Sequence, residues 1–588
     1  MRWSLDDYYP SFESGEFLED IKKLESLITL IEKIELPTPA DMPVAERASL
    51  AEKVLRQKAE LSELVGRLMS FCSLTLSVEA ANKTALSYQQ KLQQKLLKLT
   101  KPNVRFQLWI TGGNDLEELL EHSEYLREIG FYLREMVKYS RYLLSEQEEN
   151  ILSRMSLTGS NAWTRMKGYI ESQHLVELEV NGKIEKYPLP VIRNFAHDSD
   201  ADLRKKAYLA EIASYDQIAY PINSALNSIK GEVLQKVELR GYESVLEMTL
   251  LNSHLEARTL DTMFTVIKEY LPEFRKYLRH KAKLLGHENG LPFYDLFAPI
   301  GKIEKNYNFT EARTFVVGNF RKFSDRLADF AEHAFANNWI DAEPRQGKRG
   351  GAFCSTCHAI QQSRVLANFT GGLGNVTTLA HELGHAYHGY CLKDELPQNT
   401  HYSMPVAETA SIFAETIVKD AITRSAEGDA RLAILETKLM EATQVIVDIY
   451  SRYLFESNFI AERQNGDVNL ERTKELMLQA QKDAYGEGLD PKFLHPYMWL
   501  CKPHYYYAGA NYYNFPYAFG QLFAQGLYAI YLKDKDDFVL KYDAILRETG
   551  RNDITGVAAF AGIDINDKEF WKGSLDLIKS EIEEYLKF

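Results

Sequence analysis

Apolar residues recur at three- and four-residue spacing along most of the chain, which is the spacing of one face of an amphipathic helix. The same segments are rich in Leu, Ala, Lys, Glu and Gln, which favour helices. The pattern predicts helices over residues 45–100, 116–155, 201–285, 310–338, 429–464, 516–534 and 567–587. We therefore expect a mainly α-helical protein.

Alternation of apolar and polar positions is strongest over residues 176–189. This segment surrounds Asn181-Gly182, a dipeptide that favours a tight turn between two antiparallel strands. The predicted hairpin also suggests a domain boundary near residue 200. We expect an N-terminal helical domain over 1–200 and a second domain over 201–588.

A second β-like segment runs from residues 347–353 through 364–371. Its glycines allow another backbone to approach closely. The next residues, GGLGN at 371–375, lead into a helix predicted to begin near Val376. This glycine cluster lacks the Lys-Ser/Thr and the strand context of a phosphate-binding loop, so that interpretation is weak.

Composition and charge narrow the class of protein. The 588 residues are 45% hydrophobic and 26% charged, with a formal net charge of −14 and no long basic block, so no nucleic-acid partner is expected. The N-terminal residues lack the features of a signal peptide, and no apolar run of about 18 residues predicts a membrane span. Five cysteines are too few for a disulfide framework. A cytoplasmic protein without a membrane partner is expected.

The strongest chemical motif lies in the helix predicted over residues 376–390, VTTLAHELGHAYHGY. His381 and His385 are four residues apart, so both imidazoles project from one helix face and can bind one metal ion. Glu382 lies beside that face and can reach a metal-activated water. The alternative is an amphipathic helix with two hydrogen-bonded core histidines.

A second predicted helix, over residues 403–422, supplies a candidate third ligand. Glu408 lies on it, with Pro405 near the first turn and small alanines that permit close helix packing. Glu415, two turns later, suits a supporting or structural role. The alternative for Glu408 is a solvated acid favoured by the helix dipole.

The longer zinc-binding signature with a third histidine requires glycine at position 388 and histidine at position 391. This chain has His388 and Cys391 there. That class of site is therefore disfavoured, and two histidines with one glutamate remain.

The segment over residues 501–520 holds six tyrosines within 13 residues, and Pro516 is expected to open the next helix. The tyrosines before Pro516 would then lie on a loop. Phenol groups and the imidazole of His504 can donate hydrogen bonds to a tetrahedral oxyanion. Aromatic packing is the alternative for any one of the tyrosines.

Three motifs together, HELGHAYH, PVAETAS and the His504–tyrosine segment, resemble those of the M3 family of zinc peptidases, which includes thimet oligopeptidase. The resemblance is closest to the oligoendopeptidase F branch, which the starting segment WSLDDYYPSFES and GKRGGAFCS also resemble. It extends over essentially the whole chain.

The resemblance implies a mainly α-helical, two-lobed, zincin-type metallopeptidase, with a small β element near the active site and a deep channel that admits short unstructured peptides. The peptidase domain would be 201–588, with one zinc ion per chain. The matched ligands are His381, His385 and Glu408. The resemblance makes Glu382 the general base.

The same resemblance assigns substrate contact to His504. It assigns the transition-state hydroxyls to Tyr513 and Tyr517, with Tyr512 as the rival for one of these places. The aspartate that the thimet branch carries shortly before the ligand glutamate is not matched, because Pro405 stands three residues before Glu408.

The sequence leaves three alternative interpretations. Cys354, Cys357 and His358 form the C-x-x-C-H pattern of covalent haem attachment. Haem attachment needs export, and the sequence shows no signal peptide. The motif also lies in a glycine-rich, β-like segment just before the helix of the candidate zinc ligands. The two thiols could instead bind zinc with two further ligands. A catalytically inactive peptide-binding protein is the third alternative, and the complete set of site residues argues against it.

Overall fold

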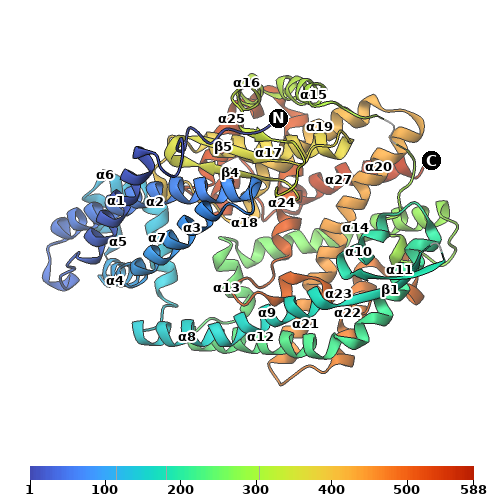
Figure 1. The fold of residues 1–588 in the computed structure, drawn as a ribbon, viewed down its shortest axis with the longest axis horizontal. Helices are drawn as coiled ribbons and strands as arrows, with labels where there is room; N and C mark the ends of the chain where they lie inside the picture. Colours follow the sequence, from blue (N-terminus) through green and yellow to red (C-terminus); the bar gives the residue numbers. More distant parts are fainter. Residues whose placement is uncertain (114, 181, 303–304) are drawn as a thin grey trace.

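The computed structural model describes residues 1–113, 115–180, 182–302 and 305–588, and helices make up most of it (Figure 1). The N-terminal helices are α1 (Gly15–Glu32), α2 (Val44–Val78), α3 (Lys83–Leu96), α4 (Thr100–Thr111), α5 (Leu116–Glu121), α6 (Glu124–Glu128), α7 (Gly130–Ser140), α8 (Glu146–Thr158) and α9 (Ser160–Gln173). The middle helices are α10 (Leu189–Asn194), α11 (Ala201–Ser214), α12 (Ala219–Arg240), α13 (Val245–Asn252), α14 (Ala257–Leu284), α15 (Phe309–Phe323) and α16 (Asp325–Ala336).

The helices that surround the candidate site follow in the C-terminal part. They are α17 (Leu373–Cys391), α18 (Met404–Ala407), α19 (Thr409–Ser425), α20 (Gly428–Thr443), α21 (Ile449–Arg463), α22 (Leu470–Tyr485), α23 (Met498–Cys501), α24 (Phe515–Lys533), α25 (Lys535–Glu548), α26 (Ile554–Phe560) and α27 (Lys568–Tyr585). A π-helical turn, Gln444–Asp448, joins α20 to α21.

Two small sheets accompany the helices. Strands β1 (Leu175–Val180) and β2 (Lys183–Pro188) form the predicted antiparallel hairpin, although Asn181 of its turn lies outside the described residues. The second sheet has the order β3-β5-β4, from β3 (Ile340–Asp341), β5 (Gln362–Leu366) and β4 (Phe353–Cys357). Strand β4 is therefore an edge strand, and it packs against α17. The second predicted β segment is confirmed.

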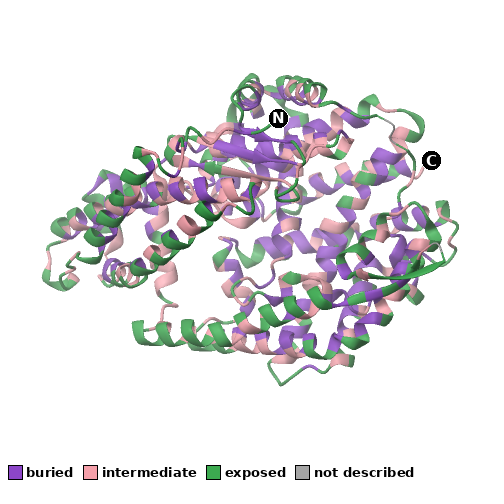
Figure 2. Ribbon diagram, viewed as in Figure 1, coloured by how far each residue is buried: buried purple, intermediate pink, exposed green. Residues whose placement is uncertain are grey.

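Buried apolar residues form three clusters. The largest extends from Val176 to Tyr585 and includes the buried faces of α17, α19 and α24. Two smaller clusters lie among the N-terminal helices, and one of them also contains Cys357 and Leu366 of the β-sheet. Figure 2 shows the buried residues concentrated around α17 and β5 and in the lower part of the molecule. The sheet thus joins the N-terminal helices to the helices of the candidate site.

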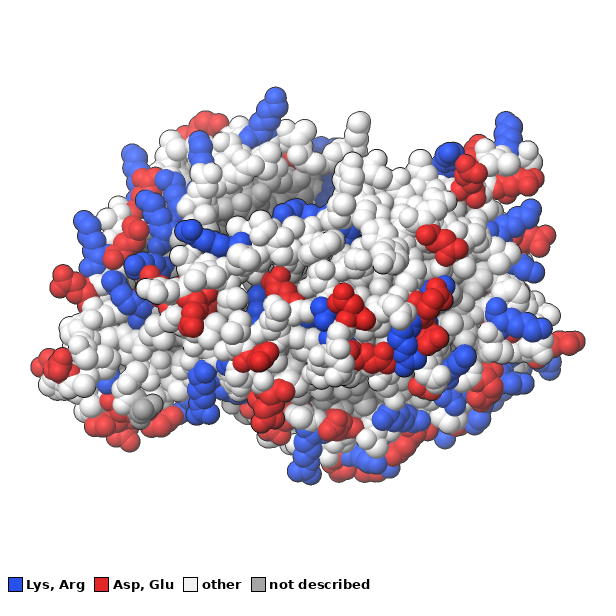
Figure 3. Space-filling view, turned by 90° about the horizontal axis from the view of Figure 1, so that it is seen from below, with Lys and Arg blue, Asp and Glu red and all other residues white. Residues whose placement is uncertain are grey.

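The molecule has two lobes in Figure 1. Helices α17, α19, α24 and α27 lie in the upper lobe with α1 to α6, and α8, α9, α12, α21 and α22 lie in the lower lobe. Figure 3 shows Lys and Arg mixed with Asp and Glu over the face seen from below. The mainly α-helical, two-lobed fold is confirmed. The proposed boundary between 1–200 and 201–588 stays a prediction.

Several predicted helices are divided in the structure. The segment 45–100 breaks at Asn82, whose side chain caps α3, and the segment 310–338 breaks at Ser324, whose side chain caps α16. The helix predicted over 403–422 divides at Glu408, which lies between α18 and α19. Side chains that cap a new helix supply backbone hydrogen bonds that periodicity does not reveal.

One described helix, α2, is long and apolar enough to cross a membrane by length and composition. Its buried face contributes to both N-terminal clusters. A single helix of this kind is weak support for a membrane span.

Candidate metal centre

Helix α17 presents the two predicted imidazoles on one face. The rings of His381 and His385 lie with their centroids 4.9 Å apart at an interplanar angle of 83°. Glu382, between them in sequence, is buried, with an exposed fraction of 6%. The helix begins after Gly372, three residues before the predicted start, so the histidines lie well inside it.

Glu408 faces both histidines. The Nε2 atoms of His381 and His385 each lie 3.3 Å from Oε2 of Glu408. All three side chains are partly exposed, so an ion could reach them. The structure therefore brings together the three residues that the sequence predicts as ligands.

The three donor atoms fit a zinc ion. Two imidazole nitrogens and one carboxylate oxygen are one of the donor sets found in catalytic zinc sites, which keep at least one further position open. Because His381 hydrogen-bonds to Glu408 and Glu415, its pKa is raised to about 10, although burial opposes this. A cation placed among the three donors would displace that proton.

The position of Glu408 follows from its place at the junction of α18 and α19. The hydroxyl of Ser411 donates to Oε2 of Glu408 over 2.9 Å. Gly384 lets α19 approach α17 closely, because a Cβ atom there would lie 2.6 Å from the carbonyl oxygen of Ala410. The small residues predicted to permit close packing are therefore used, and Ser411 is a site residue that the sequence reasoning missed.

Glu415 supports His381 from the side opposite Glu408. Its Oε2 atom lies 3.0 Å from Nδ1 of His381. A carboxylate at Nδ1 fixes the imidazole with Nε2 directed at the ion, which is a common arrangement around zinc. The other oxygen of Glu415 lies 2.6 Å from Nζ of Lys419, which follows it by four residues on α19.

The electrostatics of Glu382 differ from those of Glu408. Burial raises the pKa of Glu382, and the positive charge of His381 opposes that shift. Burial would also raise the pKa of Glu408, but hydrogen bonds from His381 and His385 hold it well below its usual range. The pKa values of two carboxylates in one cavity are therefore shifted in opposite directions. Glu382, whose pKa is raised, is not a candidate ligand.

A cavity of about 660 Å³ opens onto these residues. Residues of α2, β4, α17 and the segment 397–402 line it together with Glu408. The edge strand β4 thus forms one wall of the cavity, and α2 of the N-terminal part forms another.

His504, Tyr513 and Tyr517 lie together in the structure. The His504 ring is 5.3 Å from that of Tyr513 and 6.0 Å from that of Tyr517. The hydroxyl of Tyr513 points to Sδ of Met404 at 3.9 Å, at the start of the short helix that ends before Glu408. Burial, reinforced by Arg452, lowers the pKa of His504 to about 4, which keeps the imidazole neutral near pH 7.

Tyr512 has different surroundings. It is buried and packs its ring against Tyr453, with centroids 5.5 Å apart. Its backbone N–H donates to Oε1 of Glu456 over 3.1 Å, and the same carboxylate oxygen lies 2.7 Å from Lys230. Glu456 therefore fixes the loop from inside, and its role had no signal in the sequence.

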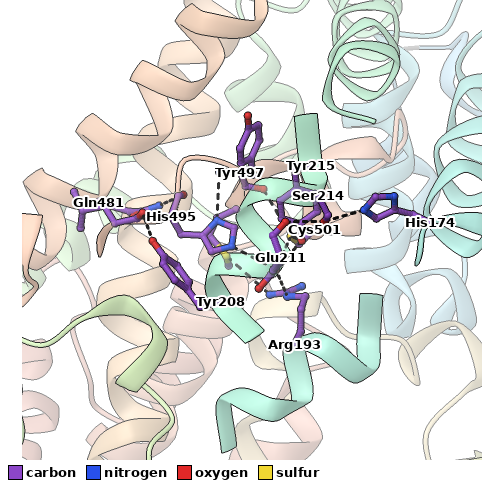
Figure 4. A network of polar contacts seen from close by, with 12 residues as sticks. His174, Arg193, Tyr208, Glu211, Ser214, Tyr215, Gln481, His495, Tyr497 and Cys501 are labelled. Atoms are coloured by element: carbon purple, nitrogen blue, oxygen red, sulfur yellow. Dashed lines mark hydrogen bonds and ion pairs between the residues drawn. The ribbon is translucent and has the colours of Figure 1, made fainter. Parts of the chain in front are cut away.

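A second group with metal-ligand chemistry lies in the lower lobe (Figure 4). Glu211, His495 and Cys501 are its members, but Oε1 of Glu211 already accepts from Tyr215 over 2.6 Å and lies 3.3 Å from Nε of Arg193. A guanidinium beside the carboxylate repels a second cation. This group is better explained as a buried hydrogen-bond network.

The C-x-x-C-H motif lies on β4 and the turn that follows it. Burial raises the pKa of Cys354 to about 12, so the thiol stays protonated. Among the described residues, neither group with metal-ligand spacing contains Cys354 or Cys357. The thiol–zinc alternative therefore loses its support.

Sequence comparisons relate this chain to one family of peptidases. The model of "Peptidase family M3" matches residues 194–577, and the model of "Oligopeptidase F" matches residues 112–172. Oligopeptidase PepF of Bacillus subtilis is 22% identical over 99% of this chain and 86% of its own length. Group B oligopeptidase PepB of Streptococcus agalactiae is 24% identical over 80% of this chain and 78% of its own.

Solved structures share the fold. A crystal structure from Chlamydophila abortus superposes with a TM-score of 0.84 at 19% identity, covering 100% of this chain and 98% of that one. Oligoendopeptidase-F from Enterococcus faecium superposes with a TM-score of 0.70 at 20% identity, covering 97% and 98%. At these identities the likeness concerns the fold.

Proposed function

We propose a specific reaction for this chain, which belongs to peptidase family M3 and is a metallo-oligopeptidase. It hydrolyses short unstructured peptides at one zinc ion. His381, His385 and Glu408 would hold the ion, and Glu382 would be the general base. The observation that carries this proposal is the convergence of two Nε2 atoms on one carboxylate oxygen, each at 3.3 Å.

The chemistry divides between the ion and the chain. When bound, zinc supplies Lewis-acid activation of water and of the peptide carbonyl. Glu382 takes the proton of the attacking water at its carboxylate and passes it to the leaving amine. Its raised pKa suits both transfers, because a base must hold the proton and then release it near neutral pH.

His504, Tyr513 and Tyr517 would donate hydrogen bonds to the oxyanion of the tetrahedral transition state. Their closeness to one another and to the start of α18 supports this assignment. Burial raises the pKa of Tyr517 to about 12, so its hydroxyl stays protonated near neutral pH and can donate a hydrogen bond. Donors that are fixed in advance stabilise developing charge without reorganisation.

The test combines metal analysis with one substitution. Glu382→Gln keeps the shape of the side chain but cannot accept the proton, so cleavage of a mixed peptide library should fall at least ~100-fold. Zinc content should stay at one ion per chain. A chelator should abolish cleavage by the wild type, and added zinc should restore it.

Two results would reject the proposal. Near-normal turnover by Glu382→Gln would remove the base from its role. A wild-type protein that binds peptides and zinc without cutting any member of the library would favour the inactive peptide-binding alternative.

A further inference from the structure

The carboxylate of Glu415, which supports His381, is itself held from behind. Nζ of Lys419 lies 2.6 Å from Oε1 of Glu415 and 2.5 Å from Oε2 of Glu441. The chain of contacts therefore runs from the candidate ligand His381 through Glu415 and Lys419 to Glu441 on α20. Each contact is within hydrogen-bond distance.

The two oxygens of Glu415 have separate partners. Oε2 faces Nδ1 of His381 at 3.0 Å, and Oε1 faces Lys419. A carboxylate held at both oxygens cannot rotate about its terminal bond without losing one of them. Lys419 thus determines which way the plane of this carboxylate faces.

Lys419 differs from the other basic side chains around it. A cavity of about 290 Å³ lies between α19, α20, α24 and α27, and Glu415 and Lys419 are among the residues that line it. Its other basic residues are Arg424, which pairs with Asp420, Arg431, which pairs with Glu584, and Lys438, which pairs with Glu581. None of these three acids contacts a candidate metal ligand, whereas the partner of Lys419 does.

The ammonium of Lys419 is charged at any working pH. Burial lowers its pKa, but Glu415 and Glu441 outweigh that effect and raise the pKa well above its usual value. Its side chain and that of Glu415 are each only about one-fifth exposed, 21% and 20%. The contact is therefore weakly screened by solvent.

We propose that Lys419 is a positioning residue of the metal centre. It holds Oε1 of Glu415 so that Oε2 receives the Nδ1 hydrogen of His381, which leaves Nε2 of that imidazole available to the ion. The inference rests on the zinc site proposed above.

The test is the affinity for zinc, measured by competition with a chelator. Lys419→Met removes the ammonium and keeps most of the side-chain volume. The dissociation constant should rise about tenfold, at the lower end of the effect of outer partners of zinc ligands. Lys419→Arg retains a cation with several N–H groups and should bind zinc more tightly than Lys419→Met does.

The matched control is Lys438→Met, in the same cavity. It removes a cation that pairs with Glu581 and should leave the zinc affinity unchanged. An unchanged affinity in Lys419→Met would overturn the inference. Tighter binding in that variant would also overturn it, because the ammonium would then act as a charge that repels the ion.

A double-mutant cycle tests whether Lys419 acts through Glu415. In a Glu415→Gln background, Lys419→Met should cause no further loss of zinc affinity. Fully additive losses would contradict the inference. If Lys419→Met does not fold, Glu441→Gln replaces it and should weaken zinc binding while the unfolding temperature stays near that of Lys438→Met.

An affinity of Glu441→Gln equal to that of the wild type would then count against the inference. Failure of the underlying zinc site has a different signature, because the wild-type protein itself would bind no zinc ion.

Discussion

Tyr512 and Tyr513 are neighbours in sequence with opposite surroundings. Tyr512 has a φ of 51°, a backbone conformation that is strained for a bulky side chain. The hydrogen bond from its N–H to buried Glu456 stabilises that conformation. As a result, the Tyr512 ring faces the core and the Tyr513 ring faces His504.

Phenylalanine variants of the loop distinguish catalysis from packing. Tyr513→Phe and Tyr517→Phe each remove one hydroxyl and keep the ring, so kcat and kcat/KM should fall together with KM little changed. Loss of one oxyanion donor typically costs about 2.7–4 kcal/mol. Steady-state kinetics on one peptide measures this.

Tyr512→Phe is the control, because its ring lies in the core. Its kcat should stay close to that of the wild-type protein. If all three variants stay within tenfold of wild-type kcat, the loop is structural and the oxyanion assignment is wrong.

His388 should make the free energy of unfolding depend on pH. Burial lowers its pKa to about 3, with His385 adding to the shift, whereas the unfolded chain binds a proton near pH 6.5. Between these values the unfolded state holds more protons, so the free energy of unfolding falls as the pH decreases. The shift corresponds to a loss on the order of 4 kcal/mol between pH 7 and pH 3.

His388→Gln should flatten this slope. Glutamine does not titrate and can still donate to Thr549, which lies 2.8 Å from Nε2 of His388. Denaturant unfolding of both proteins at several pH values between 7 and 3 measures the difference. Parallel curves would show that His388 does not contribute to the acid dependence.

At the scale of residues, the sequence indicates the candidate ligands, whereas the residues that support them have a weaker signal. The four-residue spacing of His381 and His385 is a property of any helix, so it could be predicted before the fold was known. Ser411 has no such signal, because an ordinary serine acquires this role only through the packing of α19. Lys419 lies four residues after Glu415, so their contact follows the same helical spacing, but its link to His381 depends on how α19 packs against α17. Glu456 is a similar case, since it acts on a loop 56 residues away.

At the scale of elements, the contact between α17 and α19 determines the distance between the histidines and Glu408. Gly384 occupies the crossing, where an added Cβ would lie 2.6 Å from Cα of Ser411 and 2.9 Å from Cβ of Ala414. The first of these neighbours is a backbone atom, and the second is the only side-chain carbon of an alanine. Neither can move without moving the helix.

Gly384→Ala should therefore separate the two helices. Overpacking of this kind typically costs about 1–3 kcal/mol. The zinc affinity should fall as well, because Glu408 and Ser411 move with α19. Thermal unfolding and chelator competition measure the two effects.

Gly374→Ala is the matched control in the same helix. No atom lies within 4 Å of a Cβ built at Gly374, so this variant should keep both properties. Equal behaviour of the two variants would show that the crossing tolerates a methyl group.

Element boundaries show where periodicity stops being informative. The helices predicted over 516–534 and 567–587 agree with α24 and α27 to within two residues, and 429–464 agrees with α20 and α21 joined by their π-turn. The longer predictions were divided, because an apolar stripe continues across a capping residue when both helices face the same core. Ser324 is such a residue, between α15 and α16.

At the scale of the whole molecule, the cavity of the candidate site is assembled from parts far apart in sequence. Ser62 and Glu63 of α2 line it with His358 after β4, the candidate ligands of α17 and Glu408. No local pattern predicts this meeting, because it depends on how the N-terminal helices pack on the sheet.

This arrangement predicts discrimination by the fold of the substrate. A peptide bond must enter a cavity of about 660 Å³ to reach Glu382, and a stably folded protein cannot thread a segment into it without unfolding. The expected order of cleavage is measured with one small disulfide-bonded protein in three forms: native, reduced and alkylated, and pre-cut into short peptides. The short peptides should be cleaved fastest, the unfolded chain more slowly, and the native protein not at all. Mass spectrometry of timed samples, with a chelator-treated control, separates the three. Cleavage of the native form at the rate of the short peptides would contradict a restricted site and would indicate that Glu382 is reached from an open surface.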